Sequence, residues 1–134
     1  MTSPKAQGRI VLCIGMLLSN LIYLALAFYL EAKHQPQIGD LFVRLRIPLT
    51  LVAGGLLAAG AFLSLRLRPE QAPNRFQATM LVCLALMEAC TVVGLMLFFL
   101  GLMAREFTIF VMVVIAAQAL LVLPKALTYR DACQ

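Results

Sequence analysis

The sequence predicts an all-α, polytopic membrane protein with four transmembrane helices. Of its 134 residues, 63% are hydrophobic and only 13% are charged, and the mean hydropathy is +0.95. The apolar residues gather in four long runs, and so short a chain has too little polar surface to cover them in water. Because four spans leave only short loops and tails, we expect one membrane domain, residues 1–134, without a soluble catalytic module and without enzymatic activity.

The four runs predict spans at approximately residues 10–30, 48–65, 77–103 and 107–123. Lys5 and Arg9 precede the first run as in a signal peptide. However, its 21 residues exceed the ~7 to 15 of a signal-peptide core, so we expect a retained span. Pro48 suits the first turn of the second helix, where no backbone donor is needed. Pro124 is expected to end the fourth helix.

The second run is rich in small residues. Gly54 and Ala58, like Gly55 and Ala59, have the small-x-x-x-small spacing that lets two helix backbones approach closely, and Gly60 follows them. We therefore predict close helix packing along this segment.

A polar loop follows the second run. It contains Arg66, Arg68, Pro69 and Glu70, and Pro69 and Pro73 prevent a continuous helix. The second and third spans are therefore expected to form a helical hairpin.

Glu88 is the candidate functional residue. It is the only acidic or basic residue in residues 76–103 and lies about midway along them, which places it near the centre of a bilayer. A charged carboxylate at that depth costs at least ~2 to 3 kcal/mol, and the cost falls when the carboxyl group holds a proton. We therefore expect Glu88 to bind a proton.

Four polar residues in the apolar runs are possible partners of Glu88. Thr91 lies one turn further along the same predicted helix, and Ser19 and Asn20 lie at the centre of the first span. Gln118 is the only strongly polar residue of the fourth span. Each of these side chains serves either as helix-packing glue or as a hydrogen-bond partner of Glu88, and the sequence leaves both interpretations open.

No metal site, disulfide or cofactor is predicted. Of the four cysteines, Cys13, Cys83 and Cys90 lie in apolar runs and Cys133 lies in the tail, without a Cys-x-x-Cys pair. His34 is the only histidine, so a zinc site lacks ligands.

A small-residue helix at 49–65, the polar loop at Arg68-Pro69-Glu70 and the motif ALMEACTVVGL at 85–95 occur in that order. This arrangement, over residues 49–103, resembles the proteolipid subunit c of rotary ATP synthases, with an extra helix on each side. The resemblance implies an oligomer in which Glu88 binds and releases protons, with a role in proton translocation or in a rotor. Sodium-binding members of that family carry oxygen-bearing side chains where this chain has Ala89 and Val93, so the proton is the expected ion.

Two other functions remain open. One is a structural or accessory subunit of a larger membrane complex, in which Glu88 stays protonated. The other is a small multidrug-type transporter, but that family carries its glutamate in the first span, and this chain has no tryptophan to line a drug site.

The expected partners are the lipid bilayer and either further copies of this chain or other membrane subunits. The net charge of +5 does not indicate nucleic-acid binding, because the basic residues lie at span ends. One side of the predicted topology carries seven of them, against four on the other (Lys33, Arg44, Arg46 and Arg105); the seven are Lys5, Arg9, Arg66, Arg68, Arg75, Lys125 and Arg130. The positive-inside rule therefore predicts that both termini lie in the cytoplasm. The expected location is a bacterial inner membrane or its equivalent.

Overall fold

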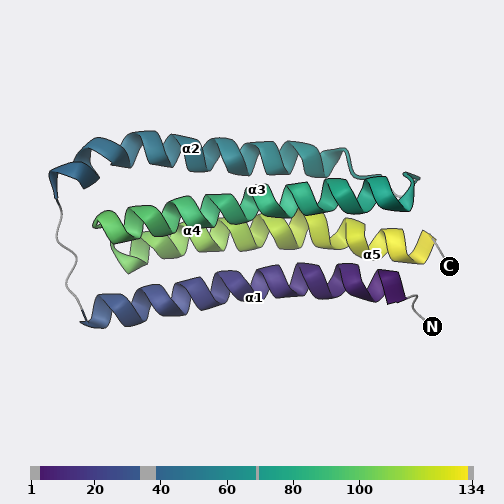
Figure 1. Ribbon diagram of the computed structural model, residues 1–134, viewed down its shortest axis with the longest axis horizontal. Helices are drawn as coiled ribbons and strands as arrows, with labels where there is room; N and C mark the ends of the chain where they lie inside the picture. The colour runs from purple at the N-terminus through teal and green to yellow at the C-terminus, as the bar shows by residue number, and fades with distance from the viewer. Residues whose placement is uncertain (1–3, 34–38, 69, 133–134) are drawn as a thin grey trace.

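The computed structural model describes residues 4–33, 39–68 and 70–132, and the side chains of residues 7–33, 39–68 and 70–129. These ranges contain helices and no strand, which confirms the all-α prediction (Figure 1). The elements are α1 (Pro4–Lys33), α2 (Asp40–Leu65), α3 (Pro73–Leu100), α4 (Ala104–Ala117), the π-helical turn η1 (Gln118–Val122) and α5 (Leu123–Ala132). The last three follow one another without a break and form one rod.

Four helices are long and apolar enough to cross a membrane: Gln7–Lys33, Asp40–Leu65, Pro73–Leu100 and Ala104–Tyr129. Many large apolar side chains face outward on them, among them Val11, Leu51, Phe99 and Leu120, each more than half exposed. Such a surface is stable against lipid chains and unstable against water. The chain is therefore an integral membrane protein with four candidate spans.

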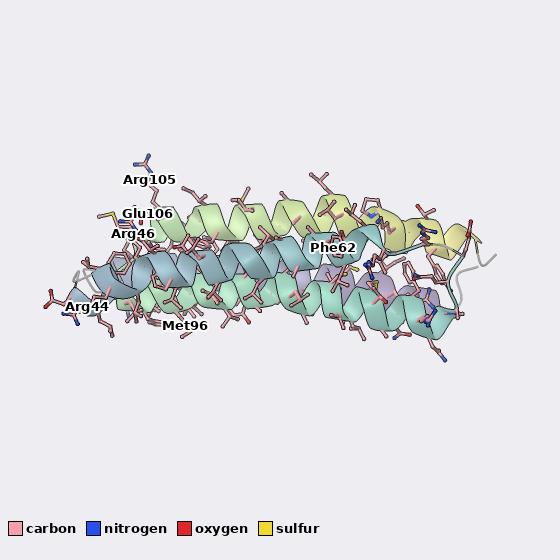
Figure 2. All side chains as sticks on the ribbon, turned by 90° about the horizontal axis from the view of Figure 1, so that it is seen from above. Arg44, Arg46, Phe62, Met96, Arg105 and Glu106 are labelled. Atoms are coloured by element: carbon pink, nitrogen blue, oxygen red, sulfur yellow. The ribbon has the colours of Figure 1, made fainter. Side chains whose placement is uncertain are left out.

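In Figure 1, α3 and the α4–η1–α5 rod run side by side through the middle of the bundle, with α2 along one side and α1 along the other. The start of α1, the α2–α3 loop and the end of α5 lie at the same end. The opposite end carries Arg44, Arg46, Arg105 and Glu106, and Figure 2 shows Arg105 pointing away from the bundle there. Charged residues thus mark both ends of the apolar bundle.

Gly60 of α2 packs tightly against α3. A Cβ atom at this position would lie 3.1 Å from Met87 Cγ and 3.3 Å from the Cys83 carbonyl oxygen. The close packing predicted for the small-residue segment therefore occurs within the chain at Gly60. The other four residues of that segment are exposed, and nothing lies within 4 Å of a Cβ placed at either glycine among them: Gly54, Gly55, Ala58 and Ala59.

The second helix begins earlier than predicted. It starts at Asp40, so Pro48 lies inside α2 and not in its first turn. The missing N–H of Pro48 removes one backbone bond, to the carbonyl of Arg44. Arg44 and Pro48 are exposed, so that carbonyl can find other donors outside the bundle.

The third helix ends at Leu100 and not at Met103. Gly101 has a φ of 134°, a conformation that residues with a Cβ atom rarely adopt, and it reverses the chain. The N–H groups of Gly101 and Leu102 donate to Phe98 O at 3.1 Å and to Leu97 O at 3.0 Å. The fourth helix then begins at Ala104.

The fourth helix does not end at Pro124. It widens into the π-helical turn at Gln118–Val122 and continues as α5 beyond the proline. A proline ring clashes with the carbonyl four residues earlier in a regular α-helix, and a wider turn relieves that clash. The helix was predicted to stop at Pro124, but it instead changes from α-helical to π-helical geometry before the proline and continues beyond it.

Candidate functional site

Glu88 lies near the middle of α3, and its side chain is partly buried. It borders the outward face of α3, where Leu81, Ala85 and Val92 are exposed. The carboxyl group extends away from this face toward α1 and η1, as its hydrogen bonds show.

Three neutral side chains donate to the same carboxyl oxygen of Glu88. Ser19 Oγ and Asn20 Nδ2, both on α1, lie 3.0 Å from Oε1, and Gln118 Nε2, on η1, lies 3.5 Å from it. Among the described residues these are the hydrogen-bond partners of Glu88, and none of them is charged. The site is therefore a polar cluster without a counter-ion for a carboxylate.

Asn20 is the centre of the cluster, and its side chain is fully buried. Its Oδ1 accepts from Thr91 Oγ1 at 2.7 Å, which directs Nδ2 toward three acceptors. These are Met16 O at 3.0 Å, Glu88 Oε1 at 3.0 Å and Gln118 Oε1 at 3.1 Å. The opposite amide orientation would set Oδ1 against three acceptors, so the network determines which way Asn20 faces.

Ser19 has two acceptors for one hydroxyl proton. Its Oγ lies 2.7 Å from Met16 O and 3.0 Å from Glu88 Oε1. A hydroxyl group can donate one hydrogen bond and accept two. Ser19 can therefore donate to a carboxylate, or it can donate to Met16 O while its oxygen accepts from a protonated carboxyl.

Gln118 enters the cluster at the first residue of η1. Its side chain is 2% exposed, and it both accepts from Asn20 and donates to Glu88. Isolated π-helical turns are frequent at functional sites, because the extra residue shifts the direction in which neighbouring side chains point. The π-helical turn that accommodates Pro124 thus begins at Gln118, the residue of this span that bonds to Glu88.

The structure brings Glu88, Ser19, Asn20 and Gln118 into direct contact, and Thr91 joins them through Asn20. Of the two interpretations left open for Ser19 and Asn20, the hydrogen bond to Glu88 is present through both residues. Thr91 was a possible partner of Glu88, and its hydroxyl donates to Asn20. Thr91 is fully buried, and its hydroxyl lies 2.7 Å from Asn20 Oδ1.

The polar loop is separate from this cluster. Arg66, Arg68 and Glu70 are exposed at the end of the bundle, and Pro69 lies outside the described residues. The Arg66 guanidinium carbon lies 5.0 Å from the centre of the Phe62 ring. Arg66, Arg68 and Glu70 therefore do not contribute to the site around Glu88.

Other polar contacts were not expected from the sequence. Glu31 Oε1 accepts from the backbone N–H of Ala104 at 3.2 Å, and Lys125 Nζ donates to the carbonyl oxygen of Ser64. Arg9 is 7% exposed and packs against Tyr129. The only signal for Lys125 was a basic residue after a proline, which indicates a span end and not an inward-facing side chain.

No cluster of typical metal-ligating side chains surrounds Glu88 among the described residues. No group of three or more His, Cys, Asp or Glu side chains lies together in the described part of the chain. Hydroxyl, amide and carboxyl groups around Glu88 instead suit hydrogen bonding and proton exchange.

Comparison of the chain with protein-family models, with curated proteins and with solved structures found no match.

Proposed function

We propose that Glu88 is a reversible proton-binding site in this integral membrane protein, and that the protein takes part in proton translocation. The observation that carries the proposal is the position of the Ser19 hydroxyl, within hydrogen-bond distance of both Glu88 Oε1 and Met16 O. This arrangement accommodates the carboxyl group with and without its proton.

The two states differ in the direction of one hydrogen bond. With Glu88 ionised, Ser19 donates to Oε1 together with Asn20. With a proton on Oε1, the carboxyl O–H donates to Ser19 Oγ, and Ser19 donates to Met16 O. Rotation of a single hydroxyl group thus links the two states, and no polar group of the cluster loses its partner.

The surroundings favour the protonated state but do not exclude the ionised one. A carboxylate at mid-membrane is costly without a cation, and its described partners are neutral. Several donors directed at Oε1 lower that cost. The side chain is only partly buried, so the carboxyl lies close to the bundle surface, where an adjoining membrane subunit can exchange its proton.

The resemblance to subunit c supports an oligomeric assembly and a rotor-like role. The α2–α3 hairpin, with its close packing at Gly60, corresponds to the two helices of that family. The loop of the hairpin shares an end with the start of α1 and the end of α5 (Figure 1). In the orientation favoured by the basic residues, this end faces the cytoplasm.

A second candidate function is that of a structural or accessory subunit in a larger membrane complex. It is favoured by the position of α1, whose Ser19 and Asn20 bond the Glu88 carboxyl and so cover the side on which a stator would approach. In this role Glu88 remains protonated, and a Glu88→Gln substitution leaves assembly and activity unchanged.

Labelling with a hydrophobic carbodiimide, which attacks protonated carboxyl groups in membranes, tests the proposal. We expect mass spectrometry to find the adduct at Glu88, with a yield that falls as pH rises because the ionised carboxylate does not react. Glu88→Gln removes the adduct, and the exposed Glu70 serves as an internal control that stays unmodified. A yield that does not change with pH favours the accessory role, and the absence of any adduct contradicts proton binding at Glu88.

A further inference from the structure

Arg9 is buried in a cluster of aromatic residues at the end of the bundle. Its guanidinium carbon lies 4.7 Å from the centre of the Tyr129 ring and 5.9 Å from that of Phe76. The two rings stack on each other, with centres 4.1 Å apart and planes inclined by 12°. Only 7% of Arg9 is exposed, so the charge lies against ring faces and not in water.

Two buried polar atoms in this region have no hydrogen-bond partner. They are Arg9 Nε, a donor, and Gln71 Oε1, an acceptor. Every other buried side-chain nitrogen or oxygen of the described residues has a hydrogen-bond partner. Tyr129 connects them, because its ring lies beside Arg9 and its hydroxyl donates to Gln71 O at 3.1 Å. We name Arg9, Gln71, Phe76 and Tyr129 the Arg9 cluster.

No described side chain supplies an anion to this buried cation. Ring faces attract a guanidinium but accept none of its hydrogen bonds well, so a buried arginine normally pairs with a carboxylate or a phosphate. Glu70, the nearest acid in the loop sequence, is exposed. The side-chain amide of Gln71 is fixed by donation from Nε2 to Arg66 O at 3.1 Å, which leaves Oε1 as the acceptor.

The position of the cluster matches the depth of lipid headgroups. Arg9 lies in the second turn of α1, Phe76 in the first turn of α3 and Tyr129 in the last turn of α5, all at the end shared by the α2–α3 loop (Figure 1). Arginine and tyrosine at the ends of spans lie in the headgroup region of a bilayer.

We propose that the Arg9 cluster binds a phosphate ester that also carries a hydroxyl group, with the phosphate on Arg9 and the hydroxyl donating to Gln71. A guanidinium presents several N–H donors in one plane, which matches two oxygens of a phosphate. A hydroxyl group supplies the donor that Gln71 Oε1 lacks. A glycerol-type phospholipid headgroup contains both groups and one negative charge, whereas a choline headgroup has no hydrogen-bond donor.

Native mass spectrometry of the purified chain tests the site with three probes: phosphatidylglycerol, phosphatidylcholine and inorganic phosphate. We expect phosphatidylglycerol to stay bound through a detergent wash about tenfold more than phosphatidylcholine. A thermal melt of the unaltered protein in nanodiscs gives a second measurement, with a higher melting temperature when phosphatidylglycerol is present. If inorganic phosphate alone produces the same stabilisation, phosphate binding at the Arg9 cluster is supported, and the ligand is free phosphate and not a lipid.

Arg9→Gln removes the guanidinium, and Arg75→Gln is its matched control, because Arg75 is exposed at the same end of the bundle and carries the same charge. We expect Arg9→Gln to lose the preference for phosphatidylglycerol and Arg75→Gln to keep it. Equal loss in both variants would assign the preference to general surface charge and overturn the proposal. No preference and no stabilisation by either phosphate probe in the unaltered protein would overturn it without reference to any variant.

Discussion

Asn20 uses both ends of its amide to connect three helical elements. Its oxygen accepts from Thr91 on α3, and its nitrogen donates to Glu88 on α3 and to Gln118 on η1. In the apolar interior of a membrane bundle no water replaces a lost partner, so each of these bonds depends on the others. The orientation of the donors around Glu88 therefore depends on Thr91, whose hydroxyl bonds to Asn20 and not to Glu88.

The first prediction concerns Thr91→Val, which keeps the shape of the side chain and removes its hydroxyl. Asn20 Oδ1 then loses its partner, and we expect the free energy of unfolding to fall by about 0.6 to 1.7 kcal/mol, the range for such bonds in membranes. Detergent-induced unfolding followed by circular dichroism measures the change. Thr50→Val is the control, because Thr50 is exposed and bonds only to Arg46 O of its own helix. Equal losses in the two variants would contradict a special role for Thr91.

At the residue scale, the sequence could identify the members of the cluster but not their pairing. Glu88, Ser19, Asn20 and Gln118 are polar residues in apolar runs, where each must find a partner. Which of them meet depends on the rotation of each helix about its axis, which hydropathy does not determine. The sequence offered Thr91 only as a possible partner of Glu88, since helical spacing considers only neighbours on the same helix, and its bond to Asn20 on another helix could not be read from it.

At the scale of the helices, Gly60 and Gly54 of α2 differ in how closely α3 approaches them. Gly60 lies against Met87 and the Cys83 carbonyl, while nothing lies within 4 Å of a Cβ placed at Gly54. We therefore predict that Gly60→Leu separates α2 from α3 and costs about 1 to 3 kcal/mol, because the Cys83 backbone cannot move aside. Gly54→Leu should change the stability of the single chain by less than about 0.5 kcal/mol.

Detergent-induced unfolding of the two leucine variants provides the measurement. If Gly54→Leu is the more destabilising, the exposed small residues of α2 pack against another molecule and not against lipid. If neither variant changes the stability, the close approach of α2 to α3 contributes nothing to the fold.

The junction of α1 and α4 depends on Glu31. Its carboxyl oxygen accepts from the N–H of Ala104, the first residue of α4, where a helix leaves its N–H groups unpaired and favours negative charge. We predict that Glu31→Ala lowers the free energy of unfolding by about 0.5 to 2 kcal/mol. Glu70→Ala, in the exposed loop, should have no measurable effect, and hydrogen exchange of the α4 N-terminus should increase only in the first variant.

The hydropathy pattern could predict how many helices exist and in what order, but not where each of them begins or ends. Pro48 and Pro124 were expected at helix ends, because proline lacks a donor and clashes with the preceding turn. In the structure, α2 extends eight residues before Pro48 to Asp40, and the rod passes Pro124 through a π-helical turn. Packing of the flanking turns outweighs the local cost of proline in both cases, and only tertiary contacts show this.

The whole molecule is an apolar bundle with one polar centre and one buried cation at its end. Its four spans were predictable, because composition and run length determine them. The coverage of Glu88 by α1 was not predictable, and it distinguishes this chain from a two-helix proteolipid hairpin.

Infrared difference spectroscopy of the reconstituted protein, recorded between low and high pH, tests reversible protonation of Glu88 most directly. The account predicts a band from a neutral carboxylic acid in a dry environment that disappears at high pH, returns at low pH and is absent in Glu88→Gln. Ser19→Ala should shift the frequency and the midpoint of this band, because the carboxyl loses the hydroxyl that serves both of its states. A band that does not respond to pH, or that persists unchanged in Glu88→Gln, would contradict the account.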